Sequence, residues 1–218
     1  MDGLFATPFD TFDSSSAVSG SRQSMLSARR LQRRHDQVGA RRQRPIDRLF
    51  FAVLPDAATA EDIADRARRL RMSHGLTGKP LEKEHFHVPL FYVGKAVCDP
   101  PTELVEALTE RAAKVAMPSF RVAFDRAMSF RNGALVLSGD DSVIGLEVLQ
   151  QRLSDVLDGR PRPARPFTPH LTLLRDSQRV AKHPIEPISW TVREVVLVDS
   201  LLGRTRHRHL ARLPLATA

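Results

Sequence analysis

Two histidines, each at the start of a short apolar run, are the residues of this sequence best suited to chemistry. His87 opens the stretch HVPLFYVG and His170 opens HLTLLRD. Residues i and i+2 of a strand share a face, so His170 and Thr172 face one way while Leu171 and Leu173 face the other. An imidazole exchanges protons near neutral pH and a hydroxyl can hydrogen-bond a phosphoryl oxygen, so this pairing suits a phosphate site.

A second histidine supplies what a single one cannot. Opening a phosphodiester requires a base to activate the attacking group and an acid to protonate the departing oxygen. One neutral and one protonated imidazole on opposite sides of phosphorus can do both without a metal. A lone histidine on a half-apolar strand is usually structural, but two such strands in equivalent places favour chemistry.

The elements around these two strands repeat one pattern. A strand–helix–strand unit that ends in a histidine-bearing strand occurs twice, which predicts an α+β chain of two similar lobes and not a doubly wound sheet. Apolar periodicity predicts helices over 56–75, 100–116 and 140–159. Apolar runs bounded by turn residues predict strands over 48–54, 85–94, 119–130, 134–139, 170–174, 190–202 and 207–215.

Size and composition fit one sizeable domain or two small lobes that share a core. The chain has 218 residues, 42% of them hydrophobic, and no apolar stretch approaches the ~20 residues that span a bilayer. Early aspartates argue against a secretory signal. The single cysteine, Cys98, excludes an internal disulfide framework and predicts a reducing compartment, hence a cytoplasmic protein.

The positive charge is concentrated at the N-terminus. Residues 1–46 hold eight arginines and four aspartates, so about half of the net charge of +8 lies in this short part of the chain. Its Ser/Arg-rich composition predicts a disordered basic tail over 1–46, followed by a folded domain over 47–218. Such a tail attracts phosphate polymers without reading their sequence, so a weak RNA-tethering role is compatible with it.

Four stretches of the chain resemble successive blocks of the LigT-like 2H phosphoesterases, the RNA 2',3'-cyclic phosphodiesterase group (ThpR, formerly 2'-5' RNA ligase). They are DRLFFAVLPD, HFHVPLFYVG, PHLTLLRD and VREVVLVDSLLGRTRHRHLARLPL, and together they run from about residue 47 to the C-terminus. The hallmark of this family is a pair of His-x-Thr/Ser-x motifs, and the second falls on His170 to Leu173. The resemblance implies an α+β bilobal fold with two pseudo-symmetric lobes of antiparallel sheet, helices outside and a central cleft.

The resemblance also implies an activity: metal-free hydrolysis of a terminal 2',3'-cyclic phosphate to a 2'-phosphate. RNA or oligonucleotide ends would be the partner, no cofactor or metal would be needed, and we expect a monomer. His170 would accept a proton from water and His87 would donate one to the departing 3'-oxygen. Thr172 and Arg175 would bind the phosphate. A phosphodiesterase acting on another small cyclic or 2',5'-linked nucleotide is an alternative within the same family.

The first motif departs from the family pattern. It falls on His87, Val88, Pro89 and Leu90, so proline stands where the family has threonine or serine. Proline donates no hydrogen bond from its side chain or its backbone nitrogen. Two interpretations follow, a slow or differently tuned enzyme and a non-catalytic RNA-end binding module with a degenerate first motif. The presence of both histidines favours the enzyme.

Arg175 matches a position that is commonly arginine in the family, but its spacing is odd. Positions 170 and 175 differ by an odd number, so in a regular strand Arg175 faces away from His170. It reaches a phosphate only if the strand ends or bulges near Leu174, and a surface salt bridge is the alternative.

Other histidines leave one further option open. His85 is expected on the same face as His87, and His-x-His on a strand can hold a metal, although no third ligand is evident nearby. The remaining candidates, His183, His207 and His209, show no spacing that indicates chemistry. The run RTRHRH is expected to be a basic hairpin at the surface.

Three residues near the second motif could contact RNA. Phe167 could stack on a base, although a place in the core is the simpler expectation. Arg162 and Arg165 could guide an RNA backbone toward the cleft. We further expect His87 and His170 to face one another across the cleft, each near the middle of its lobe's sheet.

Overall fold

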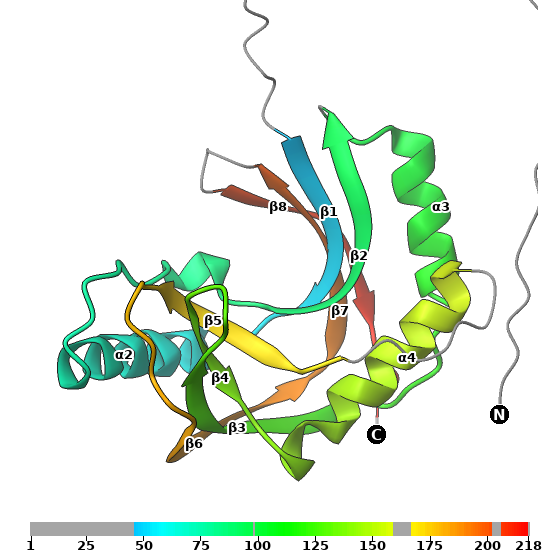
Figure 1. Ribbon diagram of the computed structural model, residues 1–218. Coiled ribbons are helices and arrows are strands. Elements are labelled where there is room, and N and C mark those ends of the chain that lie inside the picture. The colour runs from blue at the N-terminus through cyan, green and yellow to red at the C-terminus, as the bar shows by residue number, and fades with distance from the viewer. Residues whose placement is uncertain (1–45, 98, 159–166, 202–205, 218) are drawn as a thin grey trace, which may run out of the picture. The chain divides into compact units, whose positions relative to one another are not determined.

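The computed structural model describes residues 46–97, 99–158, 167–201 and 206–217, and every structural statement below concerns this part of the chain (Figure 1). Residues 1–45 of the expected tail lie outside it, as do Cys98, Arg162 and Arg165. No helix among the described residues combines the length and apolar character needed to cross a bilayer.

Eight strands of the described chain form two antiparallel four-stranded sheets. Sheet A has the order β2-β1-β7-β8 and sheet B the order β5-β4-β3-β6. The strands of sheet A are β1 (Ile46–Val53), β2 (Val88–Val97), β7 (Glu194–Leu201) and β8 (Arg206–Pro214). Those of sheet B are β3 (Phe120–Ser129), β4 (Ala134–Ser138), β5 (His170–Arg175) and β6 (His183–Val192).

Three α-helices of the described chain lie on the outside of the sheets. Asp56 starts the first helix by accepting the N–H of Thr59 at 2.8 Å, and Gly75, with φ of 63°, follows its end. This first helix contacts β5 and β6, the second contacts β8 and the third helix, and the third contacts β2 and β3. They are α2 (Ala57–Ser73), α3 (Thr102–Ala112) and α4 (Ile144–Asp158), with short 3-10 turns η1 (Lys83–His85) and η2 (Asp141–Val143).

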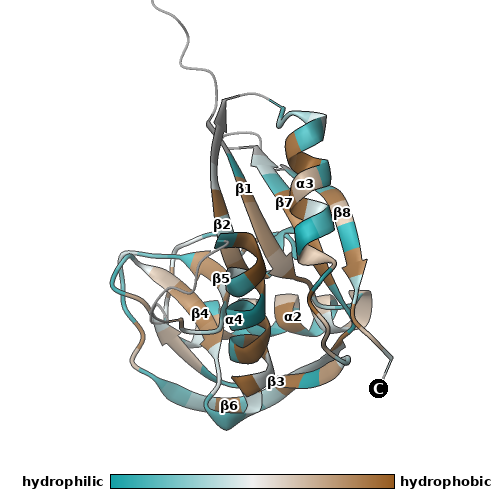
Figure 2. Cartoon of the chain, turned by 90° about the vertical axis from the view of Figure 1, so that its right-hand side faces the viewer, coloured by the Kyte–Doolittle hydropathy of each residue, from teal (hydrophilic) through white to brown (hydrophobic). Residues whose placement is uncertain are grey.

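Both sheets and the helices share one hydrophobic core. Leu49 and Phe51 of β1 are buried in the same cluster as Phe124 of β3 and Leu171 of β5. Alternate residues of the strands point the other way, and Figure 2 shows the resulting hydrophobic and hydrophilic bands along β3 and β6. Phe50 lies on the opposite face of sheet A, in a separate small cluster. The fold is therefore α+β with two lobes, as predicted.

The predicted duplication is present. In the units β1-α2-β2 and β4-α4-β5, the two strands are adjacent and antiparallel. The second strand of each unit is an edge strand of its sheet. The two edges lie against each other, and the N–H of Leu81, in the segment before β2, donates to the carbonyl of Leu173 at 2.8 Å.

One prediction about the histidines is wrong. We expected His87 and His170 near the middle of their sheets, but His170 begins the edge strand β5 and His87 directly precedes the edge strand β2. The physical reason is that the two sheets meet at these edges. Side chains that are to meet between two sheets must come from the strands that border the gap.

The number of strands also differs from expectation. The sequence predicts a single strand over 190–202, but β6 and β7 are separate strands in different sheets, divided at Arg193. Pro184 and Pro187 make the first half of β6 unlike a strand because proline cannot donate to a ladder. β6 is an edge strand, where such a loss is tolerated.

Asp176 fastens the segment before β2 to the end of β5. Its carboxylate accepts the backbone N–H groups of Thr77 (2.7 Å), Gly78 (2.6 Å) and Gln178 (2.8 Å). The N–H groups of Gln178 and Gly78 lower the pKa of Asp176 to about 2, because they stabilise its charged form. The chain at Gly78 therefore lies directly against the backbone of Arg175.

We predict that Gly78→Ala destabilises the protein. A Cβ at position 78 would lie 2.0 Å from the carbonyl oxygen of Arg175, a backbone atom that cannot rotate away. The expected loss is about 1–3 kcal/mol of unfolding free energy. Gly94→Ala is the matched control, since a Cβ there meets nothing within 4 Å. Urea denaturation measures the unfolding free energy of both variants. If Gly78→Ala were as stable as Gly94→Ala, the close approach of position 78 to the Arg175 backbone would be contradicted.

Candidate active site

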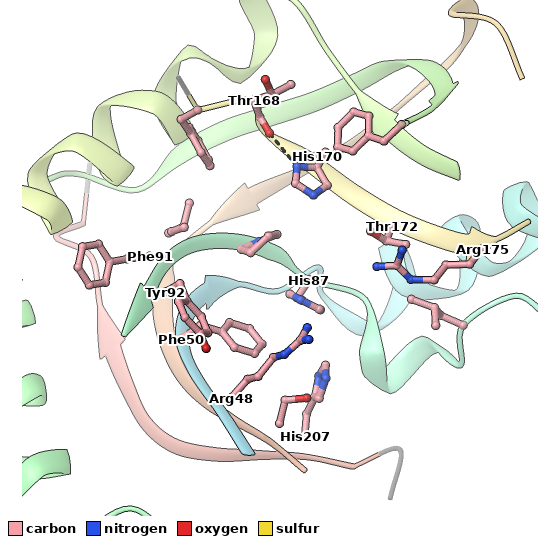
Figure 3. A pocket seen from close by; sticks show the side chains of 16 residues that line it. Arg48, Phe50, His87, Phe91, Tyr92, Thr168, His170, Thr172, Arg175 and His207 are labelled. Atoms are coloured by element: carbon pink, nitrogen blue, oxygen red, sulfur yellow. Dashed lines mark hydrogen bonds between the residues drawn. The ribbon is translucent and has the colours of Figure 1, made fainter. Parts of the chain in front are cut away.

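A cleft of about 980 Å³ lies between the two sheets at their facing edges. Both sheets contribute to its wall, together with the segments before β2 and β5 (Figure 3). No carboxylate is found among the described residues that line it. Its polar and aromatic lining includes Arg48, Phe50, His87, Tyr92, Phe130, Thr168, His170, Thr172, Arg175, Ser200 and His207.

The two predicted histidines lie together in this cleft and have the same local geometry. Nδ1 of His87 is 2.7 Å from the carbonyl oxygen of His85, and Nδ1 of His170 is 2.8 Å from that of Thr168. A carbonyl only accepts, so this contact assigns the proton to Nδ1 in both rings. The Nε2 atoms are left for a substrate, and the rings project into the same space from opposite sides (Figure 3).

Each ring also packs against a phenylalanine. The ring centroids of Phe50 and His87 are 5.1 Å apart, and those of Phe130 and His170 are 4.8 Å apart. The backbone hydrogen bond fixes one side of each imidazole and the aromatic contact limits its rotation. Two equivalent rings are thus held in place before any substrate binds, which is the geometry that acid–base catalysis requires.

Burial disfavours the protonated, charged form of both histidines. It lowers the pKa of His87 below its ordinary value, and the nearby His170 and His85 act in the same direction. Burial likewise lowers the pKa of His170. In each case the hydrogen bond to a backbone carbonyl opposes the shift, because the carbonyl favours the protonated ring.

Arg175 lines the cleft because β5 bulges near Leu174, one of the two ways that the sequence left open for it to reach the site. Leu174 and Thr172 lie opposite consecutive residues of β4, so Leu173 is an extra residue in β5. The extra residue turns Arg175 to the face that carries His170 and Thr172, and all three residues border the same cleft. No carboxylate of the described chain lies within ion-pair distance of Arg175, so the alternative of a surface salt bridge is not formed there.

Pro89 occupies the wall position that corresponds to Thr172 on the other side. It lies on the edge strand opposite Ala52, and the pairing skips the next residue, Leu90. An edge and a bulge are the places where a strand accepts proline. The first motif therefore presents a ring without a hydrogen-bond donor beside His87.

Sequence reasoning missed His207. Its strand pairs with β7 as a hairpin does, but His207 is half-buried in the cleft wall and not at the surface, with its ring 5.1 Å from that of His87 and 4.9 Å from that of His85. The described residues contain no group of three or more His, Cys, Asp or Glu arranged to hold a metal ion. The location of His207 follows from the pairing of β8 with β7, which places it opposite Ser200.

Arg48 and Phe167 also line the cleft. Arg48, exposed at the cleft wall, was not predicted as a site residue, and it forms no ion pair within the described chain. Phe167 lines the cleft and also packs against the main core, so both of its expected environments are combined. Two arginines and no described carboxylate make the cleft a suitable place for an anion.

We predict a loss of stability in acid that depends on His207. Burial and the charges of His87, His85 and His209 lower the pKa of His207 to about 4. In the unfolded chain the ring takes up its proton near pH 6.5, so the unfolded state binds more protons in this window. Stability contributed by the neutral ring is present above that pH and is lost as pH falls toward about 4.

His207→Phe should flatten this pH dependence, because phenylalanine keeps the aromatic packing and does not titrate. Unfolding free energies of wild type and variant at about pH 7 and about pH 5 test it, since all other titrating groups are common to both proteins. Equal pH slopes for the two proteins would contradict the assignment of a low pKa to His207.

Comparison with known proteins identifies relatives of the chain. The model of the 2'-5' RNA ligase superfamily matches residues 55–204. The chain is 30% identical over 173 residues to the RNA 2',3'-cyclic phosphodiesterase of Escherichia coli (strain K12), which covers 76% of this chain and 94% of that protein.

Solved structures show the same fold. A phosphoesterase and E. coli LigT complexed with NADP+ are 31% and 30% identical to the chain, with TM-scores of 0.63 and 0.62. Each match covers 79% of this chain and 99% of the other. TT0787 of Thermus thermophilus, at 21% identity and a TM-score of 0.59 over 78% of this chain and 98% of that one, supports the fold alone. The chain belongs to the 2'-5' RNA ligase superfamily and is an enzyme of the LigT-like 2H phosphoesterase type.

Proposed function

We propose that this enzyme hydrolyses the terminal 2',3'-cyclic phosphate of RNA to a 2'-phosphate by histidine acid–base catalysis without a metal. The observation that carries the proposal is the pair of imidazoles anchored through Nδ1 where two facing edge strands begin. Both present Nε2 to one cleft that contains arginines and no described carboxylate. A cyclic phosphate between them would meet one proton acceptor and one proton donor.

On the side of sheet B, His170 is the base. Its Nδ1 carries a proton that is donated to the Thr168 carbonyl, so the neutral ring has its lone pair on Nε2. Nε2 removes a proton from water as the water oxygen attacks phosphorus. The lowered pKa of His170 keeps this ring neutral and ready to accept a proton at neutral pH.

On the side of sheet A, His87 is the acid. As the bond between phosphorus and the 3'-oxygen breaks, the N–H at Nε2 of protonated His87 donates its proton to that oxygen. The products are a 3'-hydroxyl and a 2'-phosphate, with His87 neutral and His170 protonated. Proton exchange with water restores the starting state. The lowered pKa of His87 makes its protonated form a strong acid, at the cost of a small protonated fraction.

Thr172 and Arg175 would bind the non-bridging oxygens during this step. Both lie on the same cleft wall as His170, and a guanidinium can form two parallel hydrogen bonds with a phosphate. Arg48 adds a second positive charge from sheet A. Donors held in place before the reaction stabilise the charge that develops on phosphate oxygens, and this stabilisation often contributes more to the rate than any other single effect.

The named relatives support an RNA or nucleotide phosphate as the ligand. The E. coli protein is named as an RNA 2',3'-cyclic phosphodiesterase, and E. coli LigT has been crystallised with phosphate and with 3'-AMP. Pro89 is the observation that favours the second candidate, a non-catalytic module that binds RNA ends, because it removes a donor beside His87.

We predict turnover of a short RNA ending in 2',3'-cyclic phosphate in the presence of EDTA. His87→Ala and His170→Ala should each lower kcat by about 10²- to 10⁴-fold, the usual range for a lost general acid or base. His183→Ala is the matched control, because Nδ1 of His183 contacts the Ala181 carbonyl in the same way but the ring is not among the cleft residues. Wild-type protein that binds the RNA without exceeding the His170→Ala background would establish the binding module instead.

A second prediction separates the hydroxyl from the shape of Thr172. Thr172→Ala should lower kcat by on the order of 10²-fold, since it removes a donor directed at the phosphate. Thr172→Ser keeps the hydroxyl and should retain most of the activity. Rates of the two variants at saturating substrate provide the comparison, and equal losses in both would show that Thr172 acts through packing.

A further inference from the structure

The two walls of the cleft are chemically unequal. Beside His170, the wall of sheet B carries the hydroxyl of Thr172 and the guanidinium of Arg175. Beside His87, the corresponding position is Pro89, which has neither a hydroxyl nor a backbone N–H. A phosphate held between the histidines would therefore have short-range donors on one side and a proline ring on the other.

His207 is a second potential donor beside His87 in the cleft. Its ring stands edge to face with His87, at 5.1 Å between centroids and 78° between planes, and it lines the same cleft (Figure 3). It comes from β8, so its contact with His87 crosses sheet A, and its ring centroid lies 6.0 Å from that of Phe50, which also lines the cleft. This is a positioned ring and not a surface side chain.

The ring is also available for a ligand. The imidazole of His207 forms no hydrogen bond with any of the described residues, although its backbone pairs with β7. Its lowered pKa, about 4, means that the ring is neutral in neutral solution. A neutral imidazole carries one N–H donor, so it can bind a phosphate oxygen without adding a positive charge that would disfavour protonation of the neighbouring His87.

We propose that His207 donates a hydrogen bond to a non-bridging phosphate oxygen from the wall of sheet A and thereby replaces the hydroxyl that position 89 lacks. This inference rests on the proposed function of the site. His207 is preferred to Arg48 for this role because its ring contacts that of His87, whereas Arg48 is an exposed, flexible side chain. Arg48 then contributes general attraction for the anion.

A double-mutant cycle between positions 89 and 207 tests the proposal. His207→Phe preserves the aromatic packing but removes the donor, and should lower kcat by about 10²-fold. Pro89→Thr should change wild-type kcat by less than about threefold, but should recover at least about tenfold in the His207→Phe background, because the two donors substitute for one another. His207→Gln, which keeps a neutral N–H donor, should retain more activity than His207→Phe.

His209→Phe is the matched control, since His209 lies two residues along the same strand, contacts Arg212 and does not line the cleft. It should leave kcat unchanged. Unchanged kcat in His207→Phe, or additive effects of Pro89→Thr and His207→Phe, would overturn the proposal while leaving the phosphodiesterase function intact.

Affinity for an oligonucleotide ending in 2'-phosphate gives a readout that does not depend on turnover. His207→Phe should weaken binding by about tenfold and Pro89→Thr should restore it in the double variant. This pattern in a protein without turnover would retain the role of His207 and reject the catalytic function. Equal affinities of wild type and His207→Phe would reject the role of His207 whether or not wild type turns over.

Discussion

The contact between the edge strands β2 and β5 is the constraint on which the site depends. The two sheets share one hydrophobic core, and their meeting edges bring His87 and His170 into one cleft. The Leu81–Leu173 hydrogen bond and the carboxylate of Asp176 hold this edge by its backbone, so the distance between the imidazoles does not depend on long side chains. Backbone fastening of this kind is what a site needs if two catalytic groups on different sheets are to act on one atom.

Local patterns were sufficient to predict much of this site. The alternation in HLTLL predicts that Leu171 and Leu173 are buried while His170 and Thr172 face the cleft, and the structure has this arrangement. The odd spacing of Arg175 indicated that β5 must end or bulge near Leu174 if the guanidinium is to reach the cleft, and a bulge is present. In each case the deciding interaction is between neighbours along one strand, and a period of two is visible in sequence.

What sequence could not predict depends on partners far away in the chain. His207 reaches His87 only because β8 pairs with β7 and β7 with β1, an order that no local pattern encodes. The first half of β6 was not predicted because it contains Pro184 and Pro187, and proline is tolerated in a strand only where the strand lies at a sheet edge or bulges. The places of His87 and His170 at sheet edges were missed for the same reason. Tertiary pairing overrode the local signal in all three cases.

The pairing of β1 with β7 has a consequence for biosynthesis. Phe50 of β1 lies opposite Val198 of β7, so sheet A is closed by a segment translated long after β1 and β2, with the whole of sheet B in between. Until β7 has left the ribosome, β1 has one unpaired edge that can pair with another chain. Sheet B, whose four strands are consecutive in sequence, can form earlier and without this delay. The nascent protein is therefore most prone to aggregation in the period after β1 and β2 have been synthesised and before β7 and β8 are available to complete sheet A.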